Sequence, residues 1–95
     1  MLEGLTIDDF AGRVGELFRF VTDMGTVDCE LAECERLGAA EAGRIPFSLV
    51  FLGPADPGLP QRTYPCSHDE LGDFELFVVP IGRDAAGTRY EAVFT

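Results

Sequence analysis

One cysteine and the single histidine of the chain lie two residues apart, in the segment Cys66–Ser67–His68. On an extended segment these two side chains point to the same face, so the imidazole could take the thiol proton and generate a nucleophilic thiolate. Acidic residues follow at Asp69, Glu70 and Asp73, and nearby negative charge raises the pKa of a thiol. We therefore expect a structural pair, in which His68 caps or bonds a turn, and no thiol enzyme.

Four potential zinc ligands are present, but their spacing does not favour a metal site. They are Cys29, Cys34, Cys66 and His68. Structural zinc sites use paired CxxC knuckles, and the chain has none. Cys29 and Cys34 also differ by five positions, so on one regular strand they would point to opposite faces. We expect no metal.

Two carboxylates suggest acid–base chemistry. Glu75 and Glu91 lie on the two strands expected to flank a hairpin at 84–87, where they could share a face near Arg83 or Arg89. A solvated face with cross-strand ion pairs explains them better, because so small a barrel leaves little room for a catalytic cleft. Neither GxGxxG nor GxxxxGK[ST] occurs. We predict no catalytic, cofactor-binding or metal-binding residues and no enzyme activity.

Composition excludes further classes of function. The 95 residues include 17 acidic and 7 basic side chains, for a net charge of −10, whereas nucleic acids and anionic membranes attract basic surfaces. Apolar residues make up 46% of the chain, which is enough for a core. Three cysteines without a secretory segment indicate free thiols in a reducing compartment, and no apolar stretch is long enough to span a bilayer. We expect a cytoplasmic protein.

Hydrophobic periodicity predicts one mainly β domain over residues 1–95. A short helix is expected over 6–13, with Thr6 as N-cap, Asp9 completing a capping-box-like pair, and Leu5 and Phe10 spaced as a hydrophobic staple. Strands are expected at 15–22, 26–33, 46–52, 61–66, 73–80 and 88–94. Six short strands at this spacing predict a small antiparallel barrel or sandwich, and both remain open.

Turn chemistry separates the predicted strands. Asp23–Met24–Gly25 predicts a tight turn, residues 35–44 a long loop, and 84–87 a four-residue hairpin loop in which Gly87 supplies a positive φ. Pro65 indicates an edge or a kink in its strand.

Strands 46–52 and 73–80 are apolar on both faces, whereas an antiparallel strand in a small sheet usually has one wet face. Either barrel closure and the helix bury both faces, or one face meets a subunit or partner. The second hypothesis predicts a partner interface with the proline-rich loop 53–60 at its rim. Its residues would be Val50, Leu52, Pro54, Pro57, Leu59, Phe77 and Val79.

The chain resembles a family of small, uncharacterised bacterial domains. The resemblance lies in PFSLVFLGP (46–54), Tyr64, His68, Leu71–Gly72, ELFVVPIG (75–82) and GTRYEAVF (87–94), and in LTIDDFAGRVGELFRF (5–20) at the start. It implies no assigned activity and no catalytic residues. It also implies an association with phage-tail-like collar or fibre proteins.

We therefore expect a non-enzymatic protein-interaction or assembly module, such as an accessory subunit of a phage-tail-like or fibre system. Its partner would be a protein, either a second copy in a homo-oligomer or a heterologous basic chain attracted by the acidic surroundings. The alternative is a small-molecule-binding β-barrel, which would need no cofactor. Aromatic side chains would line its cavity: Phe18, Phe20, Phe47, Phe51, Tyr64, Phe74 and Tyr90.

Overall fold

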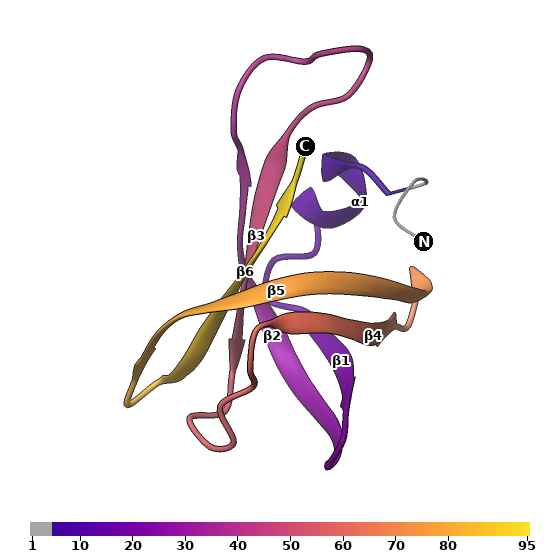
Figure 1. Ribbon diagram of the computed structural model, residues 1–95. Helices are drawn as coiled ribbons and strands as arrows, with labels where there is room; N and C mark the ends of the chain where they lie inside the picture. Colours follow the sequence, from indigo (N-terminus) through magenta and orange to yellow (C-terminus); the bar gives the residue numbers. More distant parts are fainter. Residues whose placement is uncertain (1–4) are drawn as a thin grey trace.

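Six antiparallel strands close into a barrel in the order β1-β2-β3-β6-β5-β4, with a short helix at one end (Figure 1). The computed structural model describes residues 5–95. Its elements are α1 (Ile7–Ala11), β1 (Leu17–Thr22), β2 (Gly25–Arg36), β3 (Phe47–Gly53), β4 (Arg62–His68), β5 (Gly72–Asp84) and β6 (Gly87–Phe94). The mainly β prediction is confirmed, and the choice between barrel and sandwich is resolved in favour of a closed barrel.

The helix begins where the sequence predicts and ends earlier. The Thr6 N–H donates to Oδ2 of Asp9 at 2.8 Å, which is the backbone half of a capping box. Helical geometry stops at Ala11, before Gly12, so α1 has only five residues. Its inward side chain, Phe10, is fully buried, and Leu5 packs against the same core. The helix therefore serves to place Phe10 in the mouth of the barrel.

Strand β2 runs further than the alternation of the sequence indicates. A β-bulge at Ala32 inserts one residue between the pairs Leu31–Phe51 and Glu33–Val50. The bulge shifts the inward–outward alternation by one, and pairing with β3 then continues to Arg36. The loop expected at 35–44 accordingly starts later, and the ends of β2 and β3 project from the barrel as an arm (Figure 1). We call residues 33–50 the arm.

The last hairpin is tighter than predicted. Asp84 pairs with Gly87, so the loop contains two residues, not four. The Ala86 N–H donates to Oδ1 of Asp84 at 2.8 Å, and Gly87 has the expected positive φ, 142°. A second bulge, at Ile81, lets β5 continue past Pro80 to Asp84.

Closure of the barrel rests on a short seam. Strands β1 and β4 pair at only two positions, Arg19–Ser67 and Phe20–Cys66. Pro65, which has no N–H to donate, lies next to these pairs. Its strand pairs with β5 on one side and β1 on the other, so the edge suggested by Pro65 is not a free edge.

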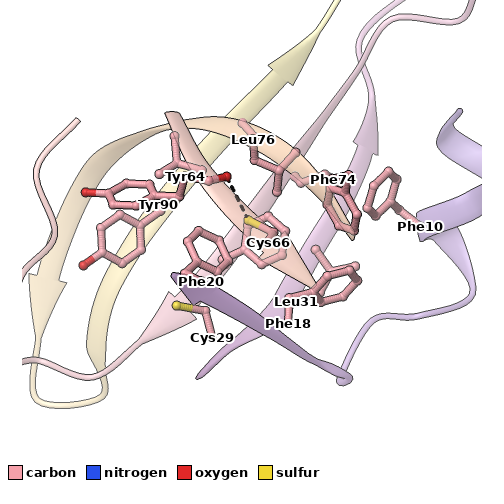
Figure 2. Packing of buried hydrophobic residues seen from close by; sticks show 14 of the residues in the cluster. Phe10, Phe18, Phe20, Cys29, Leu31, Tyr64, Cys66, Phe74, Leu76 and Tyr90 are labelled. Atoms are coloured by element: carbon pink, nitrogen blue, oxygen red, sulfur yellow. Dashed lines mark hydrogen bonds between the residues drawn. The ribbon is translucent and has the colours of Figure 1, made fainter. Parts of the chain in front are cut away.

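Aromatic rings fill the interior. Inward-pointing residues of all six strands form one cluster (Figure 2). Within it, Phe18 and Phe20 both meet Phe51 edge-on. Phe10 closes one end, with ring centroids 5.8–6.2 Å from Phe18, Phe47, Phe74 and Phe94. Within residues 5–95 no buried side-chain nitrogen or oxygen lacks a hydrogen-bond partner.

Leu59 closes the other end. Its side chain is 5% exposed and belongs to the core cluster, while its N–H donates to the Tyr90 hydroxyl at 2.8 Å. The Tyr64 hydroxyl donates to the carbonyl of Pro60 at 2.5 Å. The hydroxyl groups of these two tyrosines therefore hold the proline-rich loop over the end of the barrel opposite to α1.

Gly87 should tolerate no side chain. A Cβ at this position would lie 2.1 Å from the carbonyl oxygen of Gly53, on a backbone with positive φ. We expect Gly87→Ala to lower the free energy of unfolding by about 2–4 kcal/mol in urea titrations. Gly82→Ala is the matched control, because a Cβ there meets nothing within 4 Å. Equal effects of the two substitutions would contradict this packing.

Candidate functional site

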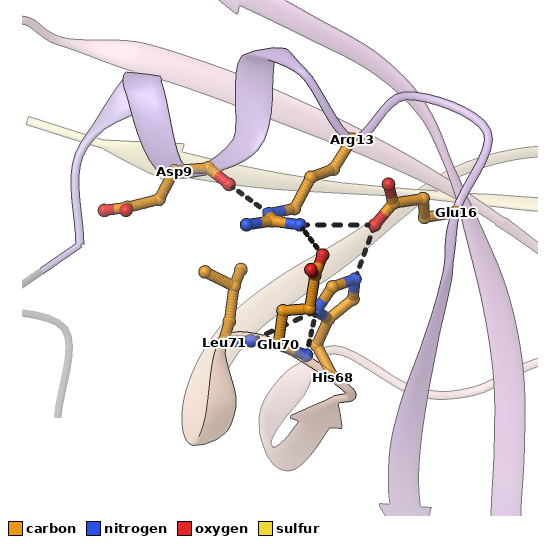
Figure 3. Close-up of polar contacts among 6 residues, drawn as sticks. All are labelled: Asp9, Arg13, Glu16, His68, Glu70 and Leu71. Carbon is orange, nitrogen blue, oxygen red and sulfur yellow. Dashed lines mark hydrogen bonds and ion pairs between the residues drawn. The ribbon is translucent and has the colours of Figure 1, made fainter.

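The Cys66–His68 pair lies inside the barrel wall and is used structurally. Both side chains are buried on the inner face of β4. His68 Nδ1 accepts the N–H groups of Glu70 and Leu71, at 3.1 and 3.2 Å, and its ring lies 4.5 Å from that of Phe18. Because Nδ1 is an acceptor, the proton sits on Nε2, which donates to Glu16 at 2.7 Å (Figure 3). Both ring nitrogens are thus engaged, and His68 bonds a turn as expected.

Glu16 and Glu70 are joined by an arginine above the histidine. Arg13 pairs with Glu70 and lies 3.6 Å from Glu16, while its Nε donates to the carbonyl of Asp9 at 2.9 Å (Figure 3). The cluster ties the end of α1 to the turn between β4 and β5. Its contacts are those of a structural clasp between two elements.

Burial keeps the inner thiols protonated. Desolvation raises the pKa of Cys66, and separately that of Cys29, to about 12. Desolvation also raises the pKa of the half-buried Cys34. A thiolate nucleophile at neutral pH is therefore disfavoured at these positions.

The predicted zinc ligands do not assemble. Among residues 5–95, no three His, Cys, Asp or Glu side chains gather closely enough to hold a metal ion. The expectation that Cys29 and Cys34 face opposite ways is wrong, because the bulge at Ala32 brings both toward the core. A single bulge exchanges the two faces of the strand for all residues after it, so odd and even spacing no longer tells which side chains share a face.

The two carboxylates on β5 and β6 are separated. Glu75 lies opposite Pro65 of β4, whereas Glu91 lies opposite Val79, four residues further along β5. Four strand residues span about 13 Å, which exceeds the carboxylate spacing of glycosidases. They do not form a dyad.

The predicted interface residues divide into three groups. Leu59 is a core residue, because it plugs the barrel, and its place in the interface was wrongly predicted. Pro54 is exposed and Pro57 half-buried, both in the loop at the barrel mouth. The remaining four lie on the outer face: Val50, Leu52, Phe77 and Val79.

The outer-face residues lie on neighbouring strands. Glu91 of β6 is paired with Val50 of β3 on one side and Val79 of β5 on the other. Val50 is only 8% exposed, whereas Phe77 is 50% and Val93 of β6 is 54% exposed. We define the outer apolar surface as Val50, Leu52, Phe77, Val79 and Val93. Val93 was missed, although its alternation with Tyr90, Ala92 and Phe94 assigns it outward.

A line of acids borders this surface on β2. Glu30, Glu33 and Glu35 point outward and lie opposite Leu52, Val50 and Ser48. With the described residues they form no ion pair, whereas Asp28 pairs with Arg19 at 3.3 Å. We call Glu30, Glu33 and Glu35 the acidic row; the bulge keeps them on one face.

The alternative function, a ligand cavity inside the barrel, finds no support in the pockets along residues 5–95. Two of these pockets, of about 420 and 560 Å³, open at one end of the barrel and on its outer side. The fully buried Phe18, Phe51 and Leu76 line none of them.

Within residues 5–95 no helix is long and apolar enough to cross a membrane.

Comparison with known proteins finds a family model over most of the chain. The family described as "Domain of unknown function (DUF6916)" matches residues 5–94. No curated protein matches the chain, and no solved structure does.

Thiol accessibility should follow burial. In folded protein at pH 8 we expect iodoacetamide to modify Cys34 first and to leave Cys29 and Cys66 intact, because a pKa of about 12 leaves about one thiolate in ten thousand. In urea all three should react, as counted by mass spectrometry. Modification of Cys66 in the folded chain would contradict its assignment as a core residue.

The acceptor role of His68 can be separated from its packing. His68→Ala removes the acceptor of two N–H groups and should lower the free energy of unfolding by about 1–3 kcal/mol. His68→Asn loses the same ring but keeps a carbonyl that can bond the turn, so it should be the milder change. If the two variants unfold at the same urea concentration, the turn does not depend on this acceptor.

Proposed function

Because the chain belongs to the DUF6916 family of domains of unknown function, its role must be argued from its own geometry, and we propose a non-enzymatic protein-interaction module. The outer apolar surface would dock a heterologous protein that carries apolar and basic side chains. The observation that carries the proposal is the half exposure of Phe77 and Val93 beside Val50 and Val79, on adjacent strands of a barrel whose interior is already full.

The exposure of these side chains favours a partner. Large aromatic and branched side chains contribute strongly to binding when a partner removes them from water. Phe77 stands on a rigid strand, opposite Thr63 of β4, so little conformational entropy is lost on docking. The surface is thus preorganised for association.

The acidic row supports a basic, heterologous partner. Two copies that met through this face would bring Glu30, Glu33 and Glu35 near their equivalents, in chains that each carry a net charge of −10. A basic partner would be attracted, because these carboxylates, which form no ion pair within residues 5–95, would steer it and fix its orientation. An accessory subunit in a larger phage-tail-like or fibre assembly fits such a one-sided interface.

Paired substitutions test the surface. The double variant Phe77→Asp/Val93→Asp should retain its melting temperature, because both side chains are half exposed, and should lose at least about tenfold in captured partner. The measurement is affinity capture from lysate of the source cells, with each captured protein identified and quantified by mass spectrometry. Met24→Asp is the control, since Met24 is also a large apolar residue and is 78% exposed, but lies in the β1–β2 turn.

Charge and oligomeric state complete the test. Glu33→Lys/Glu35→Lys and raised salt should both weaken capture of the same partner. Equal capture by wild type and Phe77→Asp/Val93→Asp would overturn the surface assignment. A stable homo-oligomer in light scattering that Phe77→Asp disperses would show that the partner is a second copy, contrary to the proposal.

A further inference from the structure

We propose that a groove beside α1 binds a small amphipathic monoanion, with an apolar body and one carboxylate. The groove encloses about 420 Å³ between the start of α1 and the arm. This volume lies within the range of about 300–1,000 Å³ typical of small-molecule sites. We call it the arm groove. It is separate from the outer apolar surface, so the inference stands independently of the proposed function.

An aromatic floor and aliphatic walls would hold the apolar body. Phe47 and Phe94 stack with ring centroids 4.3 Å apart and an interplanar angle of 7°, and Phe10 supports both from the core. Leu5, Ile7 and Ile45 line the groove and are half-buried. These walls come from the helix and the arm, so folding assembles the groove without a ligand.

Arg44 supplies the charge. Six arginines hydrogen-bond or pair with partners among residues 5–95: Arg13, Arg19, Arg36, Arg62, Arg83 and Arg89. Arg44, which lines the groove, makes no side-chain hydrogen bond or ion pair with those residues, in a chain with 17 acids. A guanidinium matches the geometry of a carboxylate, which it can bind through two parallel hydrogen bonds. An anionic group on the ligand would therefore complete the site.

The arm fixes the position of this arginine. Glu41 and Arg44 exchange two main-chain hydrogen bonds, of 2.7 and 2.9 Å, across a turn with positive φ at Ala42 and Gly43. The Glu41 side chain makes no ion pair with the described residues, so it does not neutralise Arg44. Asp8 also lines the groove and repels any anion there, so a dianion would be disfavoured more strongly than a monoanion. We therefore expect a ligand with a single negative charge placed at Arg44.

Three probes with one apolar body test the charge preference. Phenylbutyrate, phenylbutanol and phenylbutylamine should each be titrated into isotope-labelled full chain while amide resonances are followed. We expect saturable shifts at Gly43, Arg44, Ile45 and Thr95, with phenylbutyrate binding most tightly. Arg44→Gln should weaken the binding of phenylbutyrate by about three- to fivefold, a modest factor because the ion pair between Arg44 and the carboxylate is solvent-accessible. The affinity for phenylbutanol should stay unchanged. Arg36→Gln, on the same arm, should change neither.

Three further results would contradict the proposal. Ile45→Ala should weaken the binding of all three probes, so unchanged affinities would show that they bind elsewhere. An equal loss of all probes in Arg44→Gln would show that the arginine shapes the groove without recognising charge. If a chain without residues 1–4 binds phenylbutyrate and the full chain does not, the N-terminal segment is the occupant and the ligand proposal is wrong.

Discussion

The structure depends on one packing constraint, the filling of a small closed barrel by its own side chains. Six strands leave an interior that is just wide enough for inward side chains, and close packing requires that interior to be filled. Phenylalanine rings occupy it, while Phe10 and Leu59 close the two ends. Leu59 can do so because two tyrosine hydroxyls satisfy polar groups of its loop. With the interior occupied by side chains, the sites proposed for recognition, the outer apolar surface and the arm groove, lie outside the core.

The two bulges determine which side chains of β2 and β5 lie on that outer side. Without the bulge at Ala32, the acids before and after it would point to opposite faces, and two glutamates would enter the core. With it, Glu33 and Glu35 continue the line begun by Glu30 and the thiol of Cys34 turns inward. The bulge at Ile81 similarly prolongs β5 beyond the barrel body. Local irregularities thus determine which side chains face outward.

Much of the fold could be predicted because its signals are local. Capping at Thr6, the turn before Gly25 and the alternation in β1 and β5 each depend on neighbouring residues. The bulges, the plug at Leu59 and the lack of a side-chain partner for Arg44 among residues 5–95 depend on residues distant in sequence. No hydrophobic period of the sequence signals them. The positions of the predicted interface residues in the fold differ accordingly. Outward-facing positions followed from alternation, whereas the loop residue Leu59 had no alternation to place it.

The short seam between β1 and β4 has a consequence for behaviour at high concentration. A strand edge whose main-chain groups lack partners can add a strand from another molecule, which is the first step of edge-to-edge aggregation. Beyond the two paired positions, this seam carries Pro65, which removes a donor, and an ion pair of 3.3 Å between Arg62 and Asp23. A foreign strand added here would have to displace that exposed pair and lie beside a proline, which cannot donate a main-chain hydrogen bond. Both features oppose edge-to-edge addition where the closure of the barrel is narrowest.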